Sequence, residues 1–283
     1  MIKFGVAGNS KSFYDEGYTQ TIEAGLWCKN RGIDAFEYSF GRGITLNEKT
    51  AKEIGNAFRD AGVEMSAHAP YFINLANPDP EMIKKSYAHI TNSLKKVKDF
   101  GGSRVVVHPA TQGKMQREDA VNLMVENAKG LIDVLDELGY GDGYKICFET
   151  MGKLAQLGTV DEIIKVCSLD ERFYPCIDFG HINAREQGIL KSALNYNTIV
   201  QKMSDFLPKH KVLNMHVHFS KIEYGAKGEI RHLTFEDQKY GPDYEPLMEV
   251  FHQNGLEPYV ICESDGTQAE DTVQMKKYFF SLK

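Results

Sequence analysis

Several features that would assign this sequence to a special class of protein are missing from it. Its 283 residues contain no apolar run near the roughly 18 residues that cross a membrane. The apolar stretch at residues 1–8 is too short for a signal peptide. We therefore expect no membrane partner and a cytoplasmic location. Hydrophobic residues make up 42% of the chain and charged residues 25%, as is typical of a folded globular protein.

Paired cysteines and an excess of basic residues are also lacking. The cysteines are odd in number, and no two form a Cys-x-x-Cys pair; they are Cys28, Cys147, Cys167, Cys176 and Cys262. This pattern indicates reduced thiols and excludes a disulfide framework or a four-cysteine zinc site. The net charge of −6 argues against a protein that coats nucleic acid non-specifically. A local positive site is still compatible with this composition, because bound metal ions carry charge that composition does not count.

Short β-type runs alternate with longer helical patterns along the chain. The expected strands are residues 3–7, 35–40, 64–69, 104–108, 145–149, 174–178, 212–219 and 259–263. Helical patterns begin near residues 20, 48, 80, 117, 160, 195, 243 and 267, and the clearest covers 117–138. Such a series predicts an α/β fold, a single (β/α)8 TIM barrel in one domain, residues 1–283. Residues 220–241 lack strong periodicity and are expected to form a long loop at the catalytic face.

Polar side chains mark the C-terminal ends of six consecutive expected strands. They are His68, His108, Glu149, Asp178, the pair His216 and His218, and Glu263. Barrel enzymes keep their chemistry at this end of the strands. Three buried carboxylates would repel one another, and bound metal ions remove that repulsion. Mixed nitrogen and oxygen donors favour zinc, with manganese or iron as alternatives.

Two questions stay open at this level. His216 and His218 share one strand face, so one can be a ligand while the other orients it. Cys147 and Cys176 share faces with Glu149 and Asp178, and either thiol could ligate zinc. Small residues that fill the barrel interior are the simpler interpretation of these thiols.

These motifs resemble those of the endonuclease IV-type apurinic/apyrimidinic (AP) endonucleases, within the wider group of xylose isomerase-like barrels. The resemblance covers essentially the whole chain. Its most specific stretch is His68-Ala69-Pro70-Tyr71-Phe72-Ile73-Asn74-Leu75. The other matching motifs are Val107-His108-Pro109, Glu149-Thr150, Asp178-Phe179-Gly180-His181, His216 followed by Ser220-Lys221, and Glu263-Ser264-Asp265-Gly266.

The resemblance implies a cluster of two or three Zn²⁺ ions, with Mn²⁺ as an alternative. One ion would be held by His68, His108 and Glu149, and Glu149 would bridge to a second ion held by Asp178, His216 and Glu263. His181 and His232 would hold the third ion, which the family completes with an aspartate two residues before the last histidine. Ile230 stands at that position here, and the nearest carboxylate is Glu229. Either Glu229 replaces the aspartate on a shifted loop, or the third ion is weakly bound or absent.

The resemblance also implies side chains that bind damaged double-stranded DNA. Tyr71 and Phe72 match positions that enter the duplex, although an aromatic pair after a barrel strand is equally typical of a core. Arg42 matches an arginine on the loop after the second strand, and Asn74 belongs to the same motif as the aromatic pair. Lys221 and Arg231 place positive charge on residues 220–241, which suits an anionic substrate, although such charges are often simply solvated.

Together the motifs predict a zinc-dependent AP endonuclease, a DNA-repair hydrolase that cleaves 5′ to an abasic site. Glu149, which would bridge two ions, and Glu263, which would fix the nucleophile, are the catalytic candidates. No obligate protein partner is expected. The alternative is a sugar isomerase or epimerase with one divalent ion on Glu149, Asp178, His216 and Glu263. The surplus histidines favour the nuclease, whereas the acidic balance and Ile230 favour the isomerase. The intact ligand set disfavours a barrel that only binds a ligand.

Overall fold

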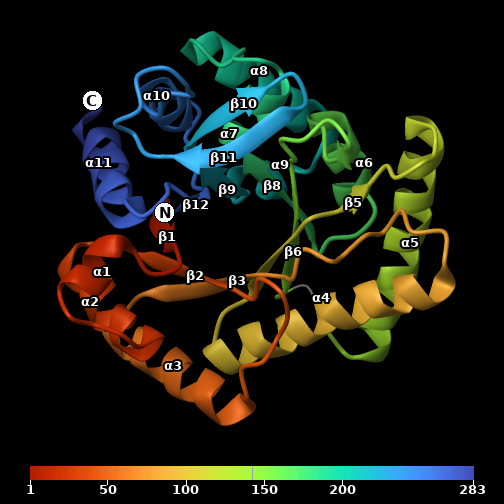
Figure 1. The fold of residues 1–283 in the computed structure, drawn as a ribbon, viewed down its shortest axis with the longest axis horizontal. Coiled ribbons are helices and arrows are strands. Elements are labelled where there is room, and N and C mark those ends of the chain that lie inside the picture. The colour runs from red at the N-terminus through yellow and green to blue at the C-terminus, as the bar shows by residue number, and fades with distance from the viewer. Residues whose placement is uncertain (142) are drawn as a thin grey trace.

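Eight parallel strands close into a barrel in the computed structural model, which describes residues 1–141 and 143–283 (Figure 1). The strands are β1 (Lys3–Ala7), β2 (Ala35–Ser39), β3 (Glu64–His68), β4 (Arg104–Val107), β6 (Lys145–Glu149), β8 (Phe173–Asp178), β9 (His216–Phe219) and β12 (Tyr259–Cys262). Around the barrel they follow this same order, and β12 pairs with β1 to close it. The predicted (β/α)8 TIM barrel is therefore confirmed.

Helices follow the strands and form the outer layer (Figure 1). They are α1 (Lys11–Asp15), the 3-10 turn η1 (Thr21–Glu23), α2 (Ala24–Asn30), α3 (Glu48–Ala61), α4 (Pro80–Phe100), α5 (Arg117–Glu137), α6 (Val160–Cys167), α7 (Phe179–Arg185), α8 (Ala193–Phe206), α9 (Lys209–Leu213), α10 (Glu245–Gln253) and α11 (Gln268–Ser281). Asn47, Asp79 and Thr159 cap the first turns of α3, α4 and α6. Gly62 and Gly101, both with positive φ, end α3 and α4. The long helix expected at 117–138 is α5.

The short helices α1, α7 and α9 are not predicted by the sequence pattern. Helix α9 occupies the start of the strand expected at 212–219, so β9 begins only at His216. A short apolar run does not distinguish a buried helical turn from a strand, which is why the expected strand starts too early. Helix α7 begins directly after β8, where the Asp178 carboxylate accepts a hydrogen bond from the backbone N–H of His181 at 2.7 Å. This turn keeps His181 beside the strand end.

A β-hairpin occupies much of the segment expected to be a loop at residues 220–241. Its strands are β10 (Lys221–Gly225) and β11 (Gly228–Leu233), paired antiparallel. Glu223 pairs with Arg231 and Tyr224 with Glu229, so Ile230 has no partner and forms a β-bulge. The bulge breaks the alternation by which a strand is recognised in a sequence. A smaller ladder pairs β5 (Ala110–Thr111) with β7 (Gln156–Leu157).

The apolar core lies mainly between the barrel and its helices. Strand β8 is buried along its whole length, and Val105, Val106 and Val107 of β4 are fully buried. Parallel strands that are covered on both faces show such unbroken apolar runs. The barrel interior is unusual because Glu37, His216 and His218 are buried in it. Within the described residues, no helix has the length and apolar character needed to cross a membrane.

Candidate metal centre

A cleft of about 240 Å³ opens at the C-terminal end of the barrel. Strand ends, the β6–α6 and β3–α4 connections, helix α7 and the β10–β11 hairpin line it with Ser39, His68, Tyr71, His108, Glu149, Met151, Lys153, Gln156, His181, Glu229, His232 and Glu263. Potential ligand atoms here form three sets, and the atoms of each set lie within 4.8 Å of one another. Converging imidazoles and carboxylates of this kind are the donor groups of a metal centre.

The first set consists of His68 at the end of β3, His108 just after β4 and Glu149 at the end of β6. Nε2 of His68 lies 3.2 Å from Oε2 of Glu149, and Nε2 of His108 lies 3.0 Å from the same oxygen. The structure thus brings together the three residues predicted for the first ion. Their shared focus on one carboxylate oxygen fits a single divalent ion between them.

The second set consists of Glu149, Asp178, His218 and Glu263. Nδ1 of His218 lies 3.1 Å from Oε1 of Glu149 and 3.4 Å from Oε2 of Glu263. Oδ2 of Asp178 is buried and has no hydrogen-bond partner among the described residues. A cation bound to this set would satisfy that oxygen, so the donor set fits a metal ion. Since Glu149 also belongs to the first set, it can bridge two ions.

His216 does not belong to this set, and its prediction as a ligand is corrected. It lies two residues before His218 on the same face of β9, roughly 7 Å deeper in the barrel along the strand. The register pairs Asp178 with His218, whereas His216 pairs with Cys176. Nε2 of His216 lies 3.1 Å from Oε2 of Glu37. Cys176, His216 and His218 form a further, fully buried group of potential ligand atoms.

The third set consists of His181, Glu229 and His232. Nε2 of His181 lies 3.4 Å from Oε2 of Glu229. Residues three apart in a regular strand face opposite sides, but the bulge at Ile230 brings Glu229 and His232 to the same side. Ile230 itself is 57% exposed. Of the two alternatives open from the sequence, the geometry matches replacement of the family aspartate by Glu229.

Two glycines allow the hairpin to approach the barrel this closely. A Cβ on Gly152 would lie 2.7 Å from the Cβ of Glu229. A Cβ on Gly228, whose φ is +88°, would lie 2.1 Å from the carbonyl oxygen of Gly152. The backbone N–H of Glu229 donates a hydrogen bond to that same carbonyl oxygen at 3.2 Å. Larger side chains at either glycine would push Glu229 away from His181.

Acceptors behind the imidazole rings determine which nitrogen faces the cleft. Nδ1 of His68 lies 2.8 Å from the carbonyl oxygen of the next residue, and Nδ1 of His181 lies 2.9 Å from that of Thr150. A ring nitrogen that contacts a carbonyl oxygen carries the proton, so Nε2 of both rings is the ligand atom. Nδ1 of His232 lies 2.8 Å from Oγ of Ser220, a contact that holds the third ring in place.

The charges in the cleft are strongly interdependent. Burial raises the pKa of Glu149, but the charges of His218 and His108 outweigh it and hold that pKa well below its usual value. Burial and the nearby carboxylates raise the pKa of Asp178. Burial alone would lower the pKa of His68, yet its hydrogen bond and attraction to Glu149 raise it to about 9. These buried carboxylates therefore need positive charge beside them, which bound cations supply equally well.

Of the residues predicted to contact DNA, Tyr71 lines the cleft, while Phe72 and Arg42 are exposed near it in the chain. Tyr71 and Phe72 are 51% and 53% exposed, with ring centroids 5.8 Å apart, so this aromatic pair is not part of the core. Arg42 is exposed on the loop after β2, and Tyr71 approaches the neighbouring Gly41 from the cleft side. The exposure of the pair favours the interpretation that it contacts a ligand.

Asn74 and Lys221 do not face the cleft, which corrects their prediction as substrate contacts. The amide of Asn74 donates to Oγ1 of Thr111 at 3.2 Å and accepts from the backbone N–H of the same residue at 3.1 Å. It therefore fastens the β3–α4 connection to β5. The buried ammonium of Lys221 donates to the carbonyl oxygen of Asp237 at 2.7 Å and pairs with Asp243 at 3.1 Å. Both side chains are occupied by the fold.

The basic residue of the cleft is Lys153 rather than Arg231. Arg231 lies on the exposed side of the hairpin, where its Nε donates to Oε2 of Glu223 at 2.7 Å. Lys153 lines the cleft, with Nζ 3.9 Å from Oε1 of Glu229. Lys153 is not predicted from the sequence, because it follows the β6 motif in an irregular connection. Glu37 is not predicted either, because its only signal is one acidic residue inside an apolar run.

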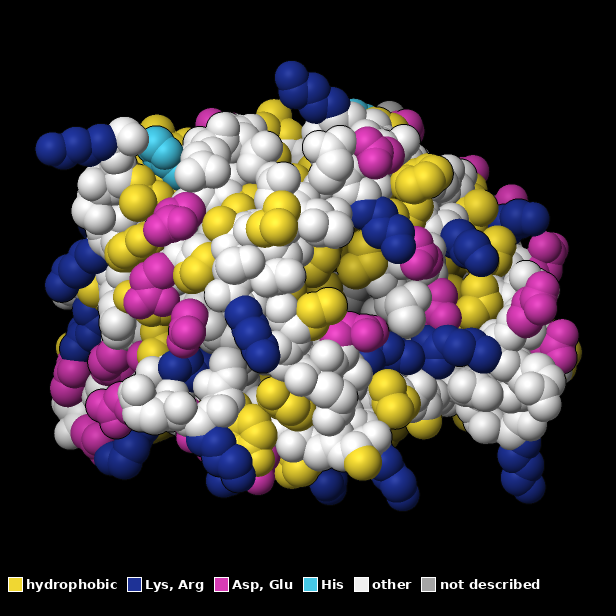
Figure 2. All heavy atoms as spheres, turned by 90° about the horizontal axis from the view of Figure 1, so that it is seen from above, with side chains coloured by type: hydrophobic (Ala, Val, Ile, Leu, Met, Phe, Trp, Pro, Cys, Tyr) yellow, Lys and Arg dark blue, Asp and Glu magenta, His cyan; other side chains and the backbone are white. Residues whose placement is uncertain are grey.

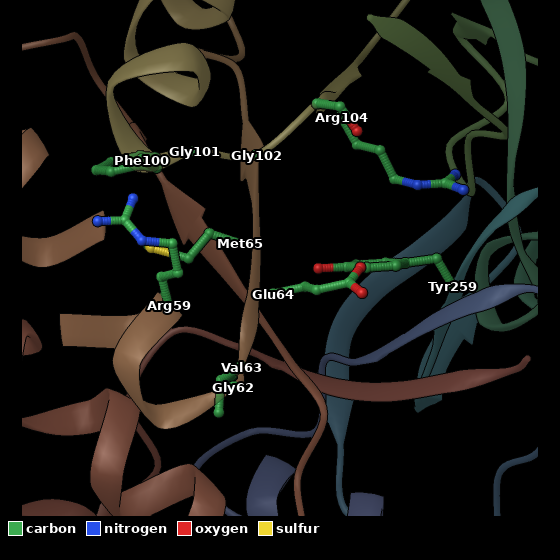
Figure 3. Close-up of a pocket in the computed structure, with 11 residues that line it drawn as sticks. Arg59, Gly62, Val63, Glu64, Met65, Phe100, Gly101, Gly102, Arg104 and Tyr259 are labelled. Carbon is green, nitrogen blue, oxygen red and sulfur yellow. The ribbon is translucent and has the colours of Figure 1, made fainter. Parts of the chain in front are cut away.

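A second cavity, of about 360 Å³, lies at the opposite end of the barrel (Figure 3). Arg59, Glu64, Arg104 and Tyr259 line it, and Glu64 pairs with Lys3 at 3.0 Å. No group of converging metal ligands occurs there among the described residues. The outer surface seen in Figure 2 carries acidic and basic side chains intermixed. The C-terminal cleft is therefore the candidate functional site.

The closed barrel, with potential metal ligands at its C-terminal end, defines the class of this protein. The chain belongs to the xylose isomerase-like TIM barrel family, whose sequence model matches residues 26–279. It is 31% identical over 278 residues to an uncharacterized protein of Methanocaldococcus jannaschii, covering 98% of this chain and 97% of that one. It is 27% identical over 213 residues to "Probable endonuclease 4" of Acholeplasma laidlawii, covering 72% and 69% of the two chains.

Solved structures share the fold at much lower identity. Endonuclease IV of Thermus thermophilus superimposes with a TM-score of 0.69 at 17% identity, covering 99% of this chain and 98% of that one. D-Psicose 3-epimerase of Clostridium cellulolyticum gives a TM-score of 0.67 at 14% identity, covering 99% and 97%. A likeness at these identities establishes the fold alone, because this barrel carries many chemistries.

Proposed function

We propose that this protein is a metal-dependent phosphodiester hydrolase that acts at abasic sites in double-stranded DNA and cleaves 5′ to the lesion. The observation that carries the proposal is the presence of three ligand sets in one cleft. A sugar isomerase with one ion needs only the second set. It would leave four imidazoles of the cleft without a ligand role, namely those of His68, His108, His181 and His232. The relatives named endonuclease 4 support the same conclusion.

The donor set favours Zn²⁺, with Mn²⁺ as the alternative, because imidazole nitrogen and carboxylate oxygen are mixed in every set. When bound, such ions polarise the phosphodiester, activate a water molecule and stabilise the leaving oxygen. Three divalent ions would exceed the charge of the four carboxylates Glu149, Asp178, Glu229 and Glu263 by two. A chain with a net charge of −6 would thereby offer a positive site to a phosphate.

The catalytic candidates Glu149 and Glu263 have different surroundings. Glu149 is fully enclosed and turns one oxygen to the first set and the other to the second, so its role is to hold both sets in register. Glu263 is the most accessible carboxylate of the second set, with 17% of its side chain exposed. It is therefore suited to accept a proton from the attacking water at the mouth of the cleft.

The rim supports recognition of an abasic nucleotide. Its cleft of about 240 Å³ cannot admit a stacked duplex, so the target nucleotide must leave the helix. Tyr71 and Phe72 are exposed where flanking bases would stack once the nucleotide has left. Arg42 and Lys153 supply positive charge near the phosphates.

A second candidate function rests on the second set alone. Glu149, Asp178, His218 and Glu263 are the two glutamates, one aspartate and one histidine that a one-metal sugar isomerase or epimerase requires. The epimerase likeness lies in the fold. Under this alternative the protein would bind close to one ion and act on ketoses.

The test combines metal content with cleavage of defined DNA. Elemental analysis of protein purified without added metal or chelator should give two or three zinc ions per chain. A duplex oligonucleotide with one abasic site should be cut on the 5′ side of the lesion, while the same duplex without the lesion stays intact. Glu263→Gln leaves three donors in the second set and should lose at least about 100-fold in the cleavage rate, with metal content measured on the same sample. One ion per chain together with ketose epimerisation would replace the proposal with the alternative.

A further inference from the structure

A buried carboxylate lies behind the candidate metal centre and belongs to none of its three ligand sets. Glu37 lies in the middle of β2 and turns into the barrel interior, where apolar residues usually pack. Its side chain is only 1% exposed. Oε1 lies 2.9 Å from Nε2 of His218, and Oε2 lies 3.1 Å from Nε2 of His216. Oε2 also accepts a hydrogen bond of 2.9 Å from Oγ of Ser66.

The contact with His218 links Glu37 to the second ligand set. Nε2 of His218 faces Glu37, while Nδ1 of the same ring faces Glu149 and Glu263. If Nε2 carries the proton that Glu37 accepts, Nδ1 is left as the ligand atom. Behind the rings of His68 and His232 lie neutral oxygens instead, at 2.8 Å from Nδ1 in both.

The contact of Glu37 with His218 has the geometry of a hydrogen bond, with Oε1 and Nε2 2.9 Å apart. The alternative is a metal ion bound by Cys176, His216 and His218, whose potential ligand atoms also lie close together. Cys176 is near the imidazoles and gives this alternative a distinct spectroscopic signature.

Aromatic packing deeper in the barrel keeps water away from the contact between Glu37 and His218. The ring of His216 lies 5.2 Å from that of Tyr259, whose other side faces the cavity at the far end of the barrel (Figure 3). Both histidines and Ser66 are completely buried. A charge–imidazole contact in such surroundings is screened far less than one in water, so its effect on the ring is strong.

We propose that Glu37 is a positioning residue that holds the imidazole of His218 with Nε2 protonated and Nδ1 directed at the second ligand set. Ser66 donates a hydrogen bond of 2.9 Å to the same carboxylate and holds it in place. The inference rests on the proposed metal centre but not on the identity of the substrate. Glu37 touches neither substrate nor metal in this scheme and acts through His218.

The test measures metal binding without any substrate. Glu37→Gln keeps the size of the side chain and removes the charge. Its amide oxygen can still accept from Nε2 of His218, so the variant removes the negative charge without removing the acceptor. We expect the dissociation constant of one bound Zn²⁺ ion to rise about 10- to 100-fold, measured by chelator competition. The visible spectrum of the Co²⁺-loaded protein should change as well. Ser66→Ala is the matched control, because it removes a neutral hydrogen bond to the same carboxylate.

Two results would overturn the inference. One is Glu37→Gln with the metal affinity and Co²⁺ spectrum of the wild type, or with losses no larger than those of Ser66→Ala. The other is a thiolate-to-Co²⁺ band that disappears in Cys176→Ala, because it would make the deeper group a metal site. Should the Gln variant not fold, ¹⁵N NMR of the zinc-loaded wild type decides. The inference requires a protonated Nε2 and a metal-bound Nδ1 on His218, and the reverse refutes it.

The outcome is separable from the proposed function. A wild-type protein that binds metal but leaves abasic DNA intact would end the nuclease proposal, while loss of an ion in Glu37→Gln would still support the positioning role. In the converse case, the wild type cleaves abasic DNA while Glu37→Gln binds metal as the wild type does. That result would support the nuclease proposal and refute the positioning role of Glu37.

Discussion

The third ligand set gives the sharpest prediction, because the sequence spacing and the structure favour different outcomes for one substitution. Glu229→Gln removes the one carboxylate of the third set, and we expect it to release one ion from the centre. Unit charges about 4 Å apart near a protein surface interact by about 4 kcal/mol. Half of that, about 2 kcal/mol, already corresponds to a roughly 30-fold weaker binding constant. Since the ion is divalent, a 30-fold increase in its dissociation constant is the smallest effect expected.

The informative variant adds Ile230→Asp to Glu229→Gln. The spacing of the related enzymes has an aspartate two residues before His232, so the sequence alone predicts that Ile230→Asp restores the ion. The structure predicts no restoration, because Ile230 is the unpaired residue of the bulge and is 57% exposed. Ile230→Asp alone is the control and should bind metal as the wild type does.

The assay is elemental analysis after dialysis against buffers of defined free zinc, with the far-UV spectrum as a check on folding. We expect one ion fewer per chain in Glu229→Gln and in the double variant than in the wild type. Recovery of the ion in the double variant would show that the hairpin adopts the regular register, and the argument from the bulge would fail. An unchanged metal content in Glu229→Gln would remove Glu229 from the centre.

Three further predictions test the rim, the hairpin and the scaffold. Phe72→Ala should raise KM for abasic duplex DNA about 10-fold, because base stacking on an aromatic ring is worth about 1–3 kcal/mol, while hydrolysis of a small phosphodiester stays unchanged; equal loss on both substrates would contradict a DNA contact. Gly152→Ala should lose the third ion in a folded protein, because the added Cβ would lie 2.7 Å from the Cβ of Glu229; full metal content would refute the close approach. Glu162 accepts a hydrogen bond from the backbone N–H of Thr159 at the start of α6 and pairs with Arg117 at 2.7 Å. Burial raises the pKa of Glu162, but these contacts outweigh burial and lower it. The charged form is therefore the stabilising one, and Glu162→Gln should cost about 1 kcal/mol near neutral pH in urea unfolding. This difference should vanish as the pH falls through the lowered pKa of Glu162, and a difference that persists in acid would exclude the charge as its cause.

The barrel could be predicted from the sequence because its strands are short apolar runs that end in glycines or polar residues. Strand β4 and helix α5 illustrate this, since both were expected within one residue of their observed ends. The β10–β11 hairpin could not be predicted, because its bulge breaks the alternation and its strands are partly exposed. The short helices α7 and α9 contain too few residues to show a helical period.

The errors in the site have a single physical origin, which is that alternation gives the face of a residue but not its depth. His216 and His218 are equivalent by alternation, and only the register with β8 separates them. Because β8 ends at Asp178, the residue paired with Asp178 is the one that reaches the cleft, and that residue is His218. The prediction of Asn74 and Lys221 as substrate contacts is wrong for a related reason. The sequence does not reveal which groups of the fold bind their side chains.

The position of Glu229 on β11 distinguishes a third ligand set that binds an ion from one that has lost this role. Moving the carboxylate one position along the strand should turn it away from His232, and three separate features reverse that effect. The bulge at Ile230 restores the face, and the extra methylene of glutamate relative to aspartate gives a longer reach. Gly152 and Gly228 remove the side chains that would block the approach. A carboxylate left over from a lost site would need none of these, because an exposed glutamate is stable in water wherever the hairpin lies. Their agreement on one geometry favours a third set that still binds an ion, and the Glu229 variants test that directly.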